Sequence, residues 1–393
     1  MLHALVVGLI LFTLSLFGRG AYPRWSYYLA FLLKATATIG VGYYYLAIAV
    51  EGDTIIHFQE AVSFNNKYGS NPLTYFNALV QADISNLSQN WRSVFFVKMI
   101  SPIVLFTGNQ YWITSLYLTL ISFIAIWSSM QVINRYYGHK WLLYLAFFTI
   151  PTSLFWTGGL FKEAIANSAF YLAISIILCL AYIKVKWPSA LLLLLCAFLL
   201  YKLRFYGLGI AIIFGVGYLL LTTASISRGK QLASIFLMLV VGFGAAQFLH
   251  PYLRPSRLPL TLFESYQSFQ PADDQPGIEL DYLDSTYIGL LLSTPKAWAS
   301  GLFRPFPGET WQLHYLPFIL EKLAFLLLAI WTIVRIKSLP RLDLWLFGLL
   351  CLSMLATFLA ISTPNFGSLV RYQSIFTPFL FLLFALLPLK KFD

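Results

Sequence analysis

Residues 188–223 read PSALLLLLCAFLLYKLRFYGLGIAIIFGVGYLLLTT. Two apolar runs, 188–203 and 205–223, fill this stretch, and each is close to the roughly 17–25 residues that a helix needs to cross a bilayer. The cations Lys202 and Arg204 stand at their junction, so the chain reverses direction with almost no loop. The stretch therefore predicts two membrane helices in immediate succession.

Similar runs recur on both sides of this stretch. The chain of 393 residues is 59% hydrophobic and 10% charged, with a mean hydropathy of +0.74. We therefore predict an all-α, polytopic transmembrane bundle that forms a single integral membrane domain over 1–393. The predicted spans number about eleven: 2–18, 27–49, 110–133, 141–157, 164–183, 188–203, 205–223, 232–249, 317–334, 344–361 and 373–389.

Two long polar loops, about 51–98 and 250–316, interrupt the series and are expected to carry interfacial helices. The run 97–107 contains Pro102 and is followed by Gly108, which predicts a half-spanning or interfacial helix. A pure membrane anchor would have short connections, so these loops are where we expect the chemistry.

The distribution of Lys and Arg predicts the orientation. Half of the 26 basic residues lie in six very short connections that alternate along the chain, and such loops face the cytoplasm. The N-terminus and both long loops are then outside a cell (inner) membrane, and the C-terminus is cytoplasmic. The net charge of +11 is this orientation signal and does not indicate a nucleic-acid partner. Residues 1–18 are interpreted as the first span, because no convincing cleavage site follows them.

The first outer loop begins with GDTIIHFQE at 52–60. If 53–64 is helical, Asp53, His57 and Glu60 fall on one face at i, i+4 and i+7, on a helix along the membrane surface. A carboxylate at the end of a span can accept a proton from a sugar hydroxyl. The alternative is an ordinary solvated helix, and a metal site would need a fourth ligand.

Basic residues stand at the other outer turns. At 151–163 two glycines precede Lys162 and Glu163, where helix amides and a lysine suit an anion. The alternative is that Lys162 snorkels to the headgroups while Glu163 serves the helix dipole. Arg204 lies beside hydrocarbon, and its planar fork suits phosphate, with snorkelling again as the alternative.

The second outer loop ends with FRPFPGETW at 303–311. Its two prolines stiffen the backbone around Arg304 and Glu309. Glu321 opens the next span and needs a partner beside hydrocarbon, and Arg371 follows the turn between the last two spans. We predict that the cations gather on one face around a lipid that carries a phosphate or pyrophosphate and a sugar. The phosphate-binding set is Lys162, Arg204, Arg304 and Arg371, with Glu163, Glu309 and Glu321 in support.

The plan of the chain resembles the multi-span glycosyltransferases of the GT-C superfamily that use lipid-linked sugars, and the related Wzy-type and EpsG-like polysaccharide polymerases. The likeness is carried by Gly52-Asp53, the FWTGGLFKE turn at 155–163, Arg304-Pro-Phe-Pro, and Asn365-Phe-Gly with Arg371-Tyr372. It implies that Asp53 acts as base or metal ligand. The chain differs from GT-C enzymes in having its acidic loop after the second span.

The sequence thus predicts an enzyme that transfers sugar, or a growing glycan, from a polyprenyl-phosphate- or pyrophosphate-linked donor at the outer face. Its expected partners are this donor, a glycan acceptor, the bilayer and other polysaccharide-assembly proteins. No cofactor is expected, with a divalent cation left as an alternative. Other interpretations are a flippase for lipid-linked glycans, a membrane O-acyltransferase with His57 as base, and a non-catalytic assembly scaffold.

Overall fold

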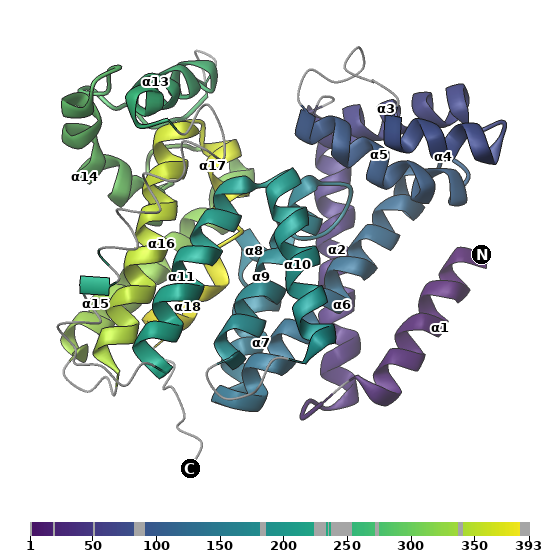
Figure 1. Ribbon diagram of the computed structural model, residues 1–393, viewed down its shortest axis with the longest axis horizontal. Coiled ribbons are helices and arrows are strands. Elements are labelled where there is room, and N and C mark those ends of the chain that lie inside the picture. Colours follow the sequence, from purple (N-terminus) through teal and green to yellow (C-terminus); the bar gives the residue numbers. More distant parts are fainter. Residues whose placement is uncertain are drawn as a thin grey trace. The chain divides into compact units, whose positions relative to one another are not determined.

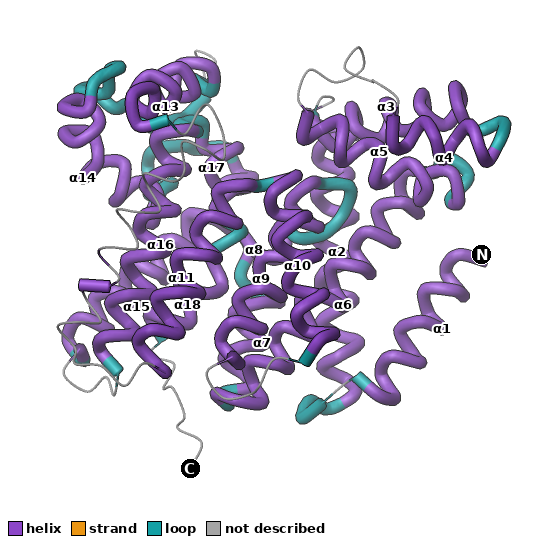
Figure 2. The backbone as a smooth tube through the Cα atoms, in the orientation of Figure 1, coloured by secondary structure: helices purple, strands orange, loops and turns teal. Residues whose placement is uncertain are grey.

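A computed structural model describes residues 2–18, 20–49, 52–81, 91–180, 186–223, 233–234, 236, 254–271, 275–336 and 341–385. The regular elements within these ranges are all helices, and no strand occurs among them (Figure 1, Figure 2). The predicted all-α class is therefore confirmed. Of the predicted span 232–249, only residues 233–234 and 236 are described, so this span stays a prediction.

Six helices in the described ranges are long and apolar enough to cross a membrane by length and composition. They are Arg24–Ala49, Tyr111–Tyr137, Lys162–Leu180, Phe205–Thr222, Leu313–Val334 and Leu342–Ser362. Leu2–Leu16 and Trp187–Leu203 are apolar but shorter. The finer prediction of about eleven spans is not confirmed.

Two predicted spans differ in detail from the structure. The run 141–157 is not one helix but two, α7 (Lys140–Phe148) and α8 (Pro151–Trp156). Pro151 explains the break, because it lacks an amide hydrogen and drives Ile150 into extended backbone, at φ −68° and ψ 121°. The described part of 373–389 contains only the eight-residue α18 (Thr377–Phe384) as a complete helix.

The chain divides into two compact units. Unit 1 is Met1–Ile176 with Val185–Leu208, and unit 2 is Ile177–Lys184 with Gly209–Asp393. Each unit is described by itself, and the single integral domain stays a prediction.

Unit 1 holds residues 51–98, the predicted first outer loop. Its helices are α1 (Leu2–Phe17), α2 (Arg24–Tyr43), α3 (Asp53–Tyr68), α4 (Pro72–Gln81), α5 (Trp91–Phe106), α6 (Tyr111–Tyr137), α7, α8, most of α9 (Lys162–Leu180) and α10 (Trp187–Leu203). In Figure 1, α3 and α4 lie crosswise near one end of α2 and α6. Phe64, Phe96 and Leu203 belong to one buried apolar cluster that joins α3, α5 and α10. This core fixes the helices that carry the candidate site.

A π-helical segment, Tyr44–Ala49, continues α2 toward α3. Gly52 then has φ +154°, and a Cβ on it would lie 2.4 Å from the Tyr45 ring. Because a side chain has no room there, glycine is required where the chain turns into α3 and Asp53.

Unit 2 holds residues 250–316, the predicted second outer loop. Its helices are most of α11 (Phe205–Thr223), α13 (Leu258–Ser268), α14 (Tyr287–Phe303), α15 (Leu316–Val334), α16 (Leu342–Ser362), α17 (Phe366–Gln373) and α18. Helix α14 packs closely against α16, where a Cβ on Gly301 would lie 2.1 Å from the carbonyl oxygen of Ala356. Gly301 thus lets the two backbones touch just before Arg304.

Candidate functional site

The predicted acidic face is built on α3, which begins at Asp53. Asp53 is partly exposed, while His57 and Glu60 are buried at 4% and 8% exposure. His57 Nδ1 lies 3.5 Å from Glu60 Oε2, a contact that becomes an ion pair when the imidazole is protonated. The predicted helix therefore forms, and it turns His57 and Glu60 inward.

Buried polar atoms on this face have no hydrogen-bond partner in the described protein. They are both ring nitrogens of His57 and Oε2 of Glu60. The imidazole meets the ring of Phe96 at a centroid distance of 5.4 Å, so its nearest wall on α5 is apolar. An unsatisfied buried polar group costs roughly 1–3 kcal/mol, and such groups in native proteins mark places where a ligand or an ordered water binds.

Two cations meet their partners where α9 begins and α10 ends. Lys162 Nζ donates to Ser93 Oγ at 3.0 Å, and Arg204 forms a buried ion pair with Glu163. Arg204 and Glu163 are only 5% and 2% exposed, so Arg204 faces the protein and does not snorkel to headgroups. Glu163, predicted as a supporting residue, neutralises it directly.

The N-terminal part of α5 is the common wall of these groups. Ser93 contacts Lys162, Phe96 contacts His57, and the two wall residues are one helical turn apart on α5. The guanidinium of Arg92 lies 4.7 Å from the ring centroid of Phe205, immediately after Arg204. In unit 1, therefore, the pair His57–Glu60 and the cations Lys162 and Arg204 lie around α5. Sequence reasoning did not single out these α5 residues, although Trp91-Arg92-Ser93 joins an aromatic, a cation and a hydroxyl.

One part of the predicted anion site is already occupied. The amide of Gly159 donates to Thr119 Oγ1 at 2.9 Å, so this amide is directed at α6. An anion bound there would depend on Lys162 and on side chains.

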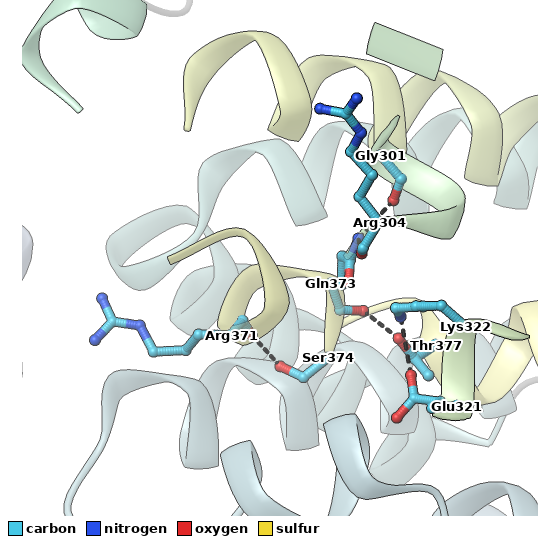
Figure 3. A network of polar contacts seen from close by, with 8 residues as sticks. All are labelled: Gly301, Arg304, Glu321, Lys322, Arg371, Gln373, Ser374 and Thr377. Atoms are coloured by element: carbon cyan, nitrogen blue, oxygen red, sulfur yellow. Dashed lines mark hydrogen bonds and ion pairs between the residues drawn. The ribbon is translucent and has the colours of Figure 1, made fainter. Parts of the chain in front are cut away.

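In unit 2, Arg304 is held by its own loop. Its Nε lies 2.9 Å from Glu309 Oε1, an ion pair whose angles are not those of a hydrogen bond. Glu309 Oε2 accepts the amide of Phe306 at 2.7 Å. The Gln373 side-chain amide donates to the carbonyl oxygens of Gly301 and Arg304, at 2.8 and 3.3 Å (Figure 3).

The other two predicted residues of unit 2 lie on α17 and α15. Arg371 packs over the ring of Tyr372, 5.2 Å from its centroid, and its guanidinium points away from that of Arg304 in Figure 3. Glu321 is buried and pairs with Lys322 at 2.9 Å, which is the partner that a carboxylate beside hydrocarbon requires. The predicted convergence of Lys162 and Arg204 with the two arginines of unit 2 stays a prediction.

No three His, Cys, Asp or Glu side chains gather as metal ligands in the described part of the chain, and Asp53, His57 and Glu60 do not form such a group. Comparison of the chain with protein-family models, curated proteins and solved structures finds no match in any of the three.

Proposed function

We propose that this protein is a membrane glycosyltransferase that uses a polyprenyl-phosphate- or pyrophosphate-linked saccharide at the outer face of a cell (inner) membrane. It would transfer or polymerise sugars during polysaccharide assembly. In this proposal the chain is multi-pass, its N-terminus is outside and its C-terminus is cytoplasmic. Its partners are the lipid-linked donor, a glycan acceptor and other assembly proteins, with no cofactor.

One observation carries the proposal. Buried, unsatisfied acid–base atoms of His57 and Glu60 lie beside the partly exposed Asp53, in the same unit as the cations Lys162 and Arg204. Sugar transfer from a lipid phosphate needs a base for the acceptor and positive charge for the leaving group. Unit 1 supplies both around α5, at the end of an apolar helix that is long enough to span a membrane.

The chemistry assigns each group a role. Asp53 accepts the proton of an acceptor hydroxyl as its oxygen attacks the anomeric carbon of the donor sugar. The bond between that carbon and the phosphate oxygen breaks, and the polyprenyl phosphate or pyrophosphate leaves with the electron pair. Lys162 stabilises the negative charge that develops on the leaving group. His57, which contacts Glu60 on the buried side of α3, orients or assists Asp53 from the same helix.

The arginines of unit 2 have a second role in this proposal. Arg304, held by Glu309 and by the amide of Gln373, and Arg371 stay in the proposed phosphate-binding set. A fixed guanidinium suits phosphate because its planar donors match two phosphate oxygens.

The test is turnover of a polyprenyl-pyrophosphate-linked oligosaccharide by purified protein in proteoliposomes, read as product length. Asp53→Asn is expected to lower the rate at least about a hundredfold, the usual contribution of a general base. Lys67→Met changes an exposed lysine at the far end of α3 and is expected to match the wild type. Equal product from wild type and Asp53→Asn would refute the assignment of the base. A donor that only changes leaflet in every sample would indicate a flippase.

A further inference from the structure

A lysine is buried in the middle of a helix that is long enough to span a membrane. Lys34 lies on α2 and is 1% exposed. Its Nζ donates to the carbonyl oxygen of Thr157 at 2.7 Å and to the hydroxyl of the same residue. Neither oxygen carries a charge, and no ion pair of Lys34 occurs among the described residues. A charged side chain within a membrane is costly, and where it occurs it marks a functional group with a specific partner.

The partner of Lys34 is the end of a short helix. Thr157 is the C-terminal cap residue of α8, and the last carbonyl groups of a helix have no partner within the helix. The negative end of the helix dipole favours a cation at this place. Ser122 on α6 donates to the same carbonyl oxygen at 2.6 Å. Thr157 is thus held from α2 and from α6.

The next two residues, Gly158 and Gly159, lie against threonine side chains of α2 and α6. Gly159 has φ +72° and directs its amide to Thr119, while Thr119 shares a hydrogen bond of 2.9 Å with Thr38, one turn after Lys34. A Cβ on Gly158 would lie 2.4 Å from Thr38 Oγ1. We call Thr157-Gly158-Gly159 the glycine turn. Hydroxyl groups and one ammonium group determine its path.

The glycine turn leads directly to the cationic pair of the candidate site. Three residues after it, α9 begins with Lys162 and Glu163, which contact Ser93 and Arg204. We propose that Lys34 is a positioning residue, which fixes the glycine turn so that α9 presents Lys162 to the phosphate of the lipid-linked donor. Its effect on sugar transfer rests on the proposed function, whereas its control of the glycine turn does not.

The first experiment needs no substrate. Hydrogen exchange of the peptide over 157–163 is measured by mass spectrometry in nanodiscs for wild type, Lys34→Met and Ser122→Ala. Lys34→Met is expected to raise the exchange rate of this peptide at least about tenfold by opening the turn locally. Ser122→Ala leaves Lys34 in place and is expected to cause a smaller rise, so it decides the matter if Lys34→Met does not fold. Lys67→Met is the control and should leave the peptide unchanged.

Unchanged exchange over 157–163 in Lys34→Met, or in Ser122→Ala where only that variant folds, would overturn the proposal. A rise spread evenly over the peptides of the whole chain would also overturn it, since it would indicate general destabilisation.

The second experiment separates positioning from simple stability. In the sugar-transfer assay, Lys34→Met is expected to raise the KM for the donor about tenfold while kcat falls less, because Lys162 binds the donor phosphate. A rise in exchange with unchanged KM would limit Lys34 to a structural role and refute its part in the site. If the wild type transfers no sugar, the proposed function fails, and the exchange result still decides whether Lys34 holds the turn.

Discussion

The buried pair Arg204–Glu163 allows a quantitative test of how unit 1 holds its charges. Glu163→Gln keeps the size of the side chain but removes the charge that Arg204 faces. The two side chains are 6% and 2% exposed, so water cannot replace the lost partner. Breaking a buried ion pair in this way destabilises a protein by about 3–5 kcal/mol. Removing both charges, in Glu163→Gln with Arg204→Met, is expected to cost less than Glu163→Gln alone, because no charge is left unpaired.

The assay is equilibrium unfolding in mixed detergent micelles for the wild type, Glu163→Gln, Arg204→Met and the double variant. The cycle is expected to give a coupling free energy of about 3 kcal/mol, at the upper end of what contacting residues show. The control is the ion pair Lys296–Asp281, whose charged atoms are 2.9 Å apart but whose side chains are 43% and 61% exposed. Asp281→Asn should lower the free energy of unfolding far less than Glu163→Gln does, because water screens an exposed pair. If Glu163→Gln is as stable as the wild type, Arg204 is not the buried, dependent cation described above.

Three further predictions concern other contacts. Lys296 lowers the pKa of Asp281 below its usual 3.8 by hydrogen bonding and charge. The stability from this pair is therefore present above pH 3.8 and declines as the pH falls through the lower pKa of the folded state. Lys296→Met should remove this pH dependence of the free energy of unfolding, as measured by acid unfolding. Gly52→Ala should destabilise the protein by about 1–3 kcal/mol, because it combines a strained φ with a clash, and Tyr45→Ala should recover part of the loss in the double variant. Gln373→Leu leaves two carbonyl groups without their donor and should lower the free energy of unfolding by about 1–3 kcal/mol, with an unchanged value contradicting the contact.

Local patterns in the sequence predict much of the fold. The apolar runs correspond to α2, α6, α9, α10, α11, α15 and α16, because hydrophobic length is a property of one segment. The polar spacing from Asp53 to Glu60 predicts α3 and its shared face. The prediction of one span over 141–157 was wrong, because the average hydrophobicity of this run hides the single proline at 151. This proline separates α7 from α8.

The contacts around the site were harder to predict. Ser93 and Gln373 look ordinary in their own helices, and Lys34 stands out only as a charge within a span. Their roles depend on partners that lie 69, 72 and 123 residues away. Such pairings depend on how the helices pack, and a single sequence does not reveal this packing. Arg204 was predicted to bind phosphate, with snorkelling as the alternative, and its burial against Glu163 excludes the alternative.

The π-helical segment Tyr44–Ala49 has a consequence for the register of the chain. Its hydrogen bonds reach one residue further than those of an α-helix, so the segment stores an inserted residue between α2 and α3. Removing one residue within it would restore α-helical bonding and rotate everything that follows by about 100° relative to α2, since an α-helix has 3.6 residues per turn. The direction in which Asp53 and His57 point within unit 1 therefore depends on the number of residues in the π-helical segment as well as on side-chain packing.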